Sequence, residues 1–213
     1  MRGVPWWGVI SSAAAPILLV GGWKLAAALQ PTSYDELTRT VSALASGSAN
    51  DQWVMTLAFV IVGACDIVTA LALRPAALPG RLILMVGGIA GTLVAASPDH
   101  GGGGSLAHAF WAAVGFAALT AWPAGSCRRG PSVPWSLRPG VSVGVSCVLL
   151  VLLGWFVVEL IDEGGLVGLA ERILGTAQAL WPLVVVLSCR RAAPGPSRWR
   201  PKPALAFRAG RPR

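Results

Sequence analysis

Charged side chains are scarce in this sequence of 213 residues. Asp, Glu, Lys and Arg make up 12% of it, about half of their share in an ordinary soluble domain, and hydrophobic residues make up 54%. Outside the long apolar runs, only a loop at about 30–51 and a tail after residue 191 are sizeable. No separate soluble domain fits into either segment.

The sequence also lacks the motifs that hold metals or phosphates. The four cysteines have no C-x-x-C spacing, and the two histidines have no helical H-x-x-x-H spacing. The glycine run at 101–104 has no G-K after it and no strand before it, which excludes a phosphate-binding loop. We therefore expect no metal, no cofactor and four free thiols.

Six apolar runs are each long enough to cross a bilayer, which requires roughly 20 residues in a helix. They cover about 7–29, 52–73, 81–98, 106–123, 140–160 and 167–189. In the third run, Gly87, Gly91 and Ala95 recur every four residues, a pattern that lets another helix approach closely. The fold class that we predict is all-α, a bundle of six transmembrane helices over residues 1–191.

Charge alternates between the ends of these spans. One set of ends is rich in arginine and the opposite set in Asp and Glu, and basic residues mark the cytoplasmic side. This predicts that both termini are cytoplasmic, with membrane lipids as partners. It also accounts for the net charge of +8 without a nucleic acid. The basic ends carry Arg2, Arg74, Arg81, Arg128, Arg129, Arg138, Arg190 and Arg191.

Two segments outside the spans have a predicted form. Ser33 and Glu36 have the spacing of a capping box, and apolar residues at helical spacing follow as far as Gly47. We expect a short amphipathic outer helix here, between the first two spans. The tail, 192–213, is rich in Pro and Arg, which predicts a disordered cytoplasmic segment.

The first span has a second interpretation. Arg2, the apolar stretch and the three alanines at 26–28 resemble a secretory signal with its cleavage site. The stretch is long for a signal and contains Pro16, so we favour a retained helix.

Asp66 is an acidic residue within the second apolar run, about 12 Å from Arg74 along a helix. Ionisable groups at this depth are costly and usually face the interior of the bundle. We predict a polar seam in which serine hydroxyls bond the Asp66 carboxyl, either to fix helix register or to contact a ligand. Its members are Asp66, Ser142, Ser146, Thr92 and Gln178.

A second group of polar residues lies at the acidic ends of the spans. Its members are Asp99, His100, Glu159, Glu171 and Arg172. We interpret them as solvated residues and not as a metal site, because nothing near the glycine run would hold ligands rigidly. His108, at the head of the fourth span, is a candidate acid or base. A serine-hydrolase arrangement of Ser42 or Ser46 with His108 and Glu171 is conceivable, but no spacing supports it.

Several stretches together resemble a bacterial, actinobacterial-type family of polytopic membrane proteins called domain of unknown function 998. They are TRTVSALAS, DQWVMTLAFVIVGACDIVTALALRP, GRLILMVGGIAGTLVAASP and LAERILGTAQALWPLVVVLSCRR, within about 4–191. The resemblance implies a multi-pass protein of the bacterial plasma membrane with six spans and no assigned reaction.

The sequence leaves three functions open. The first is interaction with a lipid or a hydrophobic small molecule inside the bundle. The second is an intramembrane enzyme acting on a lipid or isoprenoid-like substrate, with Asp66 or His108 as catalytic acid or base. The third is a proton-coupled transporter that uses Asp66, although no inverted repeat is evident. No pattern indicates an oligomeric state.

Overall fold

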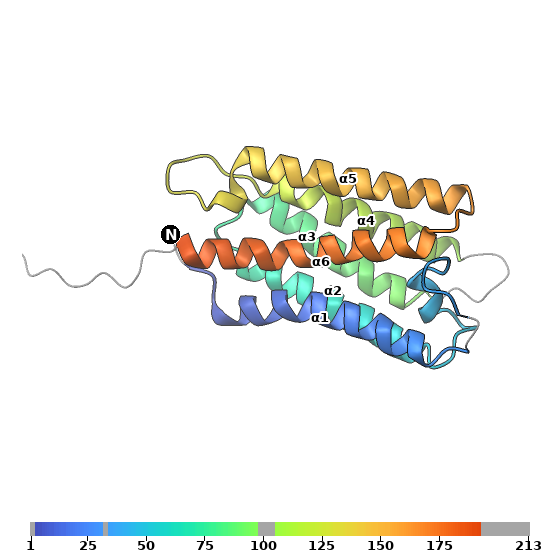
Figure 1. The fold of residues 1–213 in the computed structure, drawn as a ribbon. Coiled ribbons are helices and arrows are strands. Elements are labelled where there is room, and N and C mark those ends of the chain that lie inside the picture. Colours follow the sequence, from blue (N-terminus) through green and yellow to red (C-terminus); the bar gives the residue numbers. More distant parts are fainter. Residues whose placement is uncertain (1–2, 32–33, 98–104, 193–213) are drawn as a thin grey trace, which may run out of the picture.

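Six long α-helices make up the computed structural model, which describes residues 3–31, 34–97 and 105–192 (Figure 1). The described residues form helices and turns and contain no strand. Each of the six helices is long and apolar enough to cross a membrane, which confirms the predicted spans. The helices are α1 (Trp6–Ala28), α2 (Trp53–Ala72), α3 (Leu78–Ala95), α4 (Leu106–Gly125), α5 (Pro139–Ile161) and α6 (Val167–Ala192).

Local sequence explains where several helices begin and end. Pro79 and Pro139 stand in the first turns of α3 and α5, where proline has no hydrogen bond to lose. Ser105 precedes α4, and its hydroxyl oxygen accepts the backbone N–H three residues further on, at 3.3 Å. Arg190 and Arg191 lie in the last turn of α6, where positive charge complements the helix dipole.

Consecutive helices pack side by side, and α6 closes the bundle by contacting both α1 and α5. Consecutive helices run antiparallel to one another (Figure 1). Helix α5 contributes least to the interior, since only Ser142, Leu149 and Phe156 are buried on it. Most of its surface is therefore available to lipid.

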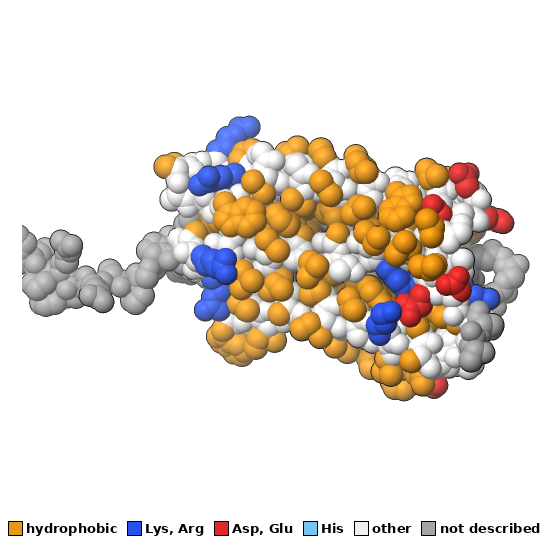
Figure 2. All heavy atoms as spheres, in the orientation of Figure 1, with side chains coloured by type: hydrophobic (Ala, Val, Ile, Leu, Met, Phe, Trp, Pro, Cys, Tyr) orange, Lys and Arg blue, Asp and Glu red, His pale blue; other side chains and the backbone are white. Residues whose placement is uncertain are grey.

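The two ends of the bundle differ in charge (Figure 2). We call the end where α1 begins and α6 finishes the basic end; it carries Arg74, Arg81, Arg128, Arg129, Arg138, Arg190 and Arg191. We call the opposite end the acidic end; it carries Asp35, Glu36, Asp51, Glu159, Asp162, Glu163 and Glu171. On the face that Figure 2 shows, the surface between the two ends is mostly free of charged side chains and carries many hydrophobic ones.

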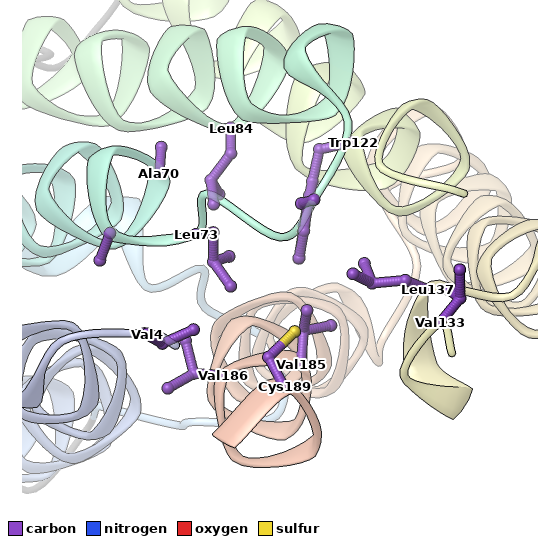
Figure 3. Close-up of a cluster of buried hydrophobic side chains, with 12 residues drawn as sticks. Val4, Ala70, Leu73, Leu84, Trp122, Val133, Leu137, Val185, Val186 and Cys189 are labelled. Carbon is purple, nitrogen blue, oxygen red and sulfur yellow. The ribbon is translucent and has the colours of Figure 1, made fainter. Parts of the chain in front are cut away.

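The basic end is packed with apolar side chains (Figure 3). Trp122 of α4 and Leu84 of α3 meet Leu73, which follows α2, and Val185 and Cys189 of α6. All five are 3% exposed or less. This packing closes the interior on the arginine-rich side.

The segment between α1 and α2 contains less helix than its sequence predicts. Its one helical element is a four-residue 3-10 helix, η1 (Ser42–Ala45). Of the expected capping box, Ser33 lies outside the described residues and Glu36 pairs with Lys24 instead, at 2.9 Å. Val41 and Leu44 are buried and pack this segment against Trp23 and Met55.

Tertiary hydrogen bonds explain why this helix is short. The Leu37 carbonyl accepts from the backbone N–H groups of Gly168 and Leu169, at 2.8 and 3.1 Å. The carbonyls of Glu36 and Arg39 accept from Arg172. A helix over these residues would need the same carbonyls for its own ladder. The expected tail, apart from Ala192 at the end of α6, lies outside the described residues, so the boundary near 191 stays a prediction.

Candidate functional site

A cavity of about 120 Å³ lies inside the acidic half of the bundle. Side chains from every long helix except α5 line it, together with the start of η1. Most of the lining is apolar or aromatic. The lining residues used below are Leu19, Val41, Ser42, Phe59, Asp66, Gly91, Trp111, Phe116, Glu171, Gly175 and Gln178.

Asp66 lies at the deep end of the cavity, because it is the lining residue of α2 furthest from the acidic end. Its side chain is 4% exposed. Within the described part of the chain, its carboxyl forms no hydrogen bond and no ion pair. Its oxygen atoms keep some accessible surface, unlike the sealed indole N–H of Trp122, and that surface faces the cavity.

Gln178 of α6 lies at a similar depth and has a fixed orientation. Its amide nitrogen Nε2 donates to the Phe116 carbonyl and to Thr120 Oγ1, both at 3.1 Å. A carbonyl can only accept, so the amide nitrogen and not the amide oxygen must face Phe116. The oxygen Oε1 therefore points elsewhere, and no described residue donates to it.

Glu171 closes the other end of the cavity with a fully engaged carboxyl. One oxygen accepts the backbone N–H of Val41, and the other accepts the Ser42 hydroxyl at 3.2 Å. The side chain is 5% exposed. These bonds hold the start of η1 over the acidic end of the cavity.

Arg172 holds the same segment from the next position on α6. Its Nη1 donates to the carbonyls of Glu36 at 2.6 Å and Arg39 at 2.8 Å, and its Nη2 donates to the Tyr34 hydroxyl at 2.9 Å. Its guanidinium carbon lies 6.0 Å from the centroid of the Trp23 ring. Burial raises the pKa of the Tyr34 phenol above its ordinary range, so this hydroxyl stays neutral beside Arg172.

The predicted seam is only partly assembled. Gln178 lines the cavity with Asp66, but the two serines of α5 bond elsewhere. Ser142 Oγ donates to the Ser136 carbonyl at 3.2 Å, and Ser146 Oγ accepts the Ala124 N–H at 3.0 Å. The expected serine bonds to Asp66 are therefore wrong, because α5 packs on the outside of α4 and α6 and does not reach the cavity.

Thr92 of α3 also takes no part in a bond to Asp66. Its hydroxyl donates to the Gly88 carbonyl of its own helix at 3.1 Å. That bond satisfies the hydroxyl where α2 and α3 lie closest.

The predicted acidic-end cluster separates into unrelated groups. Glu171 and Arg172 are buried and hold the 34–42 segment, so they are not solvated as we expected. Glu159, near the end of α5, accepts from Trp155 Nε1 of the same helix at 3.2 Å and from Leu166 N, in the turn before α6, at 3.0 Å. Asp99 and His100 lie outside the described residues.

His108 lies away from the cavity lining. Its Nδ1 is 3.1 Å from the Ser97 carbonyl, which links the start of α4 to the end of α3. The hydrolase arrangement weighed above is therefore incomplete: Ser42 and Glu171 meet, but His108 is occupied elsewhere. Among the described residues, no three His, Cys, Asp or Glu side chains gather as a metal site would need.

Sequence reasoning missed the role of the Glu171–Arg172 pair. A signal was present, because these two charges follow the start of an apolar span, where ionisable groups usually have a protein partner. Their partners come from more than 125 positions earlier in the chain, which spacing alone does not reveal.

Six apolar helices, five of which line an internal cavity, define a polytopic helical membrane protein. The chain belongs to the family described as "Protein of unknown function (DUF998)", whose profile matches residues 12–188. No curated protein and no solved structure matches the chain.

Proposed function

We propose that this membrane protein binds a hydrophobic small molecule, or the apolar end of a lipid, in the cavity of its acidic half. The observation that carries the proposal is the Asp66 carboxyl, which is buried, faces the cavity and has no partner among the described residues. A buried polar group without a hydrogen bond costs roughly 1–3 kcal/mol. A ligand that bonds to Asp66 would recover that cost.

The size of the cavity limits the ligand. An engineered apolar cavity of about 150 Å³ accommodates benzene, so about 120 Å³ suits a group the size of a six-membered ring. A longer molecule would place one end in the cavity and extend out between the helices. The apolar lining favours such a molecule over a sugar or a nucleotide.

The two other functions have less support. An enzyme with His108 as its acid or base would need that side chain at the cavity, but His108 bonds the Ser97 carbonyl and does not line the cavity. An enzyme with Asp66 as its acid or base would share the cavity with the binding function proposed here. A transporter would need polar groups from Asp66 to both surfaces. Towards the basic end, Leu73, Trp122 and Val185 belong to a packed apolar cluster.

The charge of the two ends supports an orientation. Arginine gathers at one end of the bundle, and basic residues are retained on the cytoplasmic side during insertion. We propose that the basic end faces the cytoplasm of a bacterial cell and that the cavity lies in the outer half of the plasma membrane.

Filling the cavity tests the proposal. Gly175 lines the cavity, and a Cβ on it would lie 3.7 Å from Leu19 Cδ2, an ordinary contact, so Gly175→Leu would occupy the space without a backbone clash. Gly154→Leu is the matched control, because Gly154 lies on α5, outside the cavity lining, and has nothing within 4 Å of its Cβ position.

We expect native mass spectrometry and solvent extraction of the purified wild type and of Gly154→Leu to yield the same bound small molecule. Gly175→Leu should lose it while remaining folded. Equal recovery from all three proteins, or recovery from none, would contradict ligand binding in this cavity.

A further inference from the structure

The polar groups at the deep end of the cavity define the chemistry of its ligand. Resting on the function proposed above, we propose that the cavity takes a neutral apolar alcohol, with the hydroxyl at the deep end against Asp66 and Gln178. The ring or chain of the alcohol then lies towards Glu171 and η1.

Both deep groups are hydrogen-bond acceptors. Gln178 has its Nε2 occupied by Phe116 and Thr120, which leaves the carbonyl oxygen Oε1 for a ligand. The Asp66 carboxyl has no partner among the described residues, and it accepts a hydrogen bond whether it is ionised or protonated. Two acceptors at one end of an apolar space are complementary to a ligand that donates.

Both acceptors line the deep end of the same cavity. On α2, Asp66 is the last cavity residue counted from the acidic end, and on α6 only Ala179 follows Gln178. At the other end of the cavity, both Glu171 oxygens already accept from Val41 and Ser42. A hydrogen-bond donor on the ligand therefore finds free acceptors at the deep end of the cavity and not at the end near Glu171.

A hydroxyl suits this position better than an ammonium group. A cation would have to lose its hydration inside an apolar bundle, and this desolvation costs far more free energy than desolvating a neutral hydroxyl. No basic side chain lines the cavity among the described residues, so Asp66 is the one group at the deep end that could offset a ligand's positive charge. A hydroxyl can also accept, which matches a protonated Asp66.

The rest of the lining suits an apolar body. Phe59, Trp111 and Phe116 contribute aromatic rings, and Gly91 and Gly175 leave room beside them. With about 120 Å³ available, a six-membered ring bearing one short hydroxylated arm is the appropriate probe.

Four probes of similar size test the inference: benzyl alcohol, benzylamine and benzaldehyde, and toluene, which lacks their polar atom. Ligand-detected NMR on the full chain in lipid nanodiscs would give their dissociation constants, with signals from empty nanodiscs subtracted. The proteins to compare are the wild type, Asp66→Leu and Asp66→Asn. The readout is the dissociation constant of toluene divided by that of benzyl alcohol, measured for each protein. The free energy of desolvating the hydroxyl enters this ratio equally in all three proteins, so differences between them report on contacts with residue 66.

We expect Asp66→Leu to lower this ratio about fivefold, because the variant loses one hydrogen bond to the alcohol and the net free energy of one such bond corresponds to about that factor in affinity. Toluene should still bind. Asp66→Asn should keep the ratio within about twofold, because its amide oxygen still accepts. The corresponding ratios, the toluene dissociation constant divided by that of benzaldehyde or benzylamine, should change less in Asp66→Leu than the ratio for benzyl alcohol does.

An unchanged benzyl alcohol ratio in Asp66→Leu would overturn the inference, and so would a larger Asp66-dependent change for benzylamine or benzaldehyde. If none of the four probes binds the wild type, or if Gly175→Leu binds them equally well, the proposed function itself fails. The two failures are therefore distinguishable.

Discussion

Arg172 shows how a single buried charge organises a segment that has little structure of its own. Three carbonyls and one phenol oxygen accept hydrogen bonds from its guanidinium, and one of the carbonyls belongs to Gly168 of its own helix. The side chain is 8% exposed. Planar, always charged and rich in donors, arginine suits such a position better than lysine does.

Replacing this side chain is expected to release the segment from α6. Arg172→Met should lower the free energy of unfolding by about 3–5 kcal/mol, because the carbonyls of Glu36 and Arg39 would each lose a bond to a charged donor, at about 1.5–3 kcal/mol per bond. Lys24→Met is the control: it removes the exposed ion pair with Glu36, which contributes about 1 kcal/mol or less. Circular dichroism during titration with denaturing detergent would measure both, and equal losses would contradict the assigned role of Arg172.

Two buried carboxyl groups of the bundle differ in their hydrogen bonds. Both oxygens of Glu171 accept hydrogen bonds, which hold residues 41 and 42 against α6. Asp66 has none among the described residues. A buried polar group that lacks a hydrogen bond lowers stability, and such exceptions are expected at functional sites. Asp66 is therefore the residue at which we look for function.

At the scale of the helix, glycine decides how closely α2 and α3 approach. A Cβ on Gly63 would overlap the Gly88 carbonyl and lie 2.6 Å from Thr92 Oγ1. The glycine pattern that we noted on α3 did predict close packing on that helix. However, the nearest approach is at Gly88, while Gly87 faces Leu119 of α4 and Gly91 has open space at its Cβ position.

This difference predicts opposite results for the same substitution. Gly63→Ala should destabilise the bundle by about 1–3 kcal/mol, because the helices must separate to admit the methyl group. Gly91→Ala should be neutral or stabilise by up to about 1 kcal/mol, since the new Cβ meets nothing within 4 Å and alanine favours the helix. Thermal unfolding in one detergent would compare them, and a loss of similar size in both would refute the close contact at Gly63.

At the scale of the whole molecule, charge and apolar surface have separate roles. The apolar belt makes the molecule a membrane protein, and the arginines at one end favour one orientation within the membrane. The acidic end, which carries the 34–46 segment and the cavity beneath it, would then face outwards.

Cysteine labelling in intact cells tests this orientation. In a variant with all four native cysteines replaced by alanine, Glu163→Cys at the acidic end should react with a membrane-impermeant maleimide. Arg129→Cys at the basic end should react only after the cells are permeabilised. Both positions are exposed, so accessibility within the protein is matched. The reverse pattern would place the basic end outside.

The sequence predicted the spans well and the site poorly, for identifiable reasons. Span ends fell within three residues of the observed helices, because apolar length and flanking proline or arginine are local signals. Asp66 and Gln178 were both among the predicted site residues, and both line the cavity. Ser142 and Ser146 were grouped with them by depth, but depth does not say which helices are neighbours.

Taken alone, the sequence determined that the chain crosses a membrane six times, because a run of apolar residues can satisfy its backbone in lipid only as a helix. It also determined which helix ends carry positive charge. The tertiary structure alone decided that α5 stays outside and that Glu171 and Arg172 hold the 34–42 segment. It also decided that Asp66 faces a cavity and has no partner among the described residues. Those outcomes depend on which helix faces meet, and contacts between residues more than 100 positions apart leave no periodic trace in the sequence.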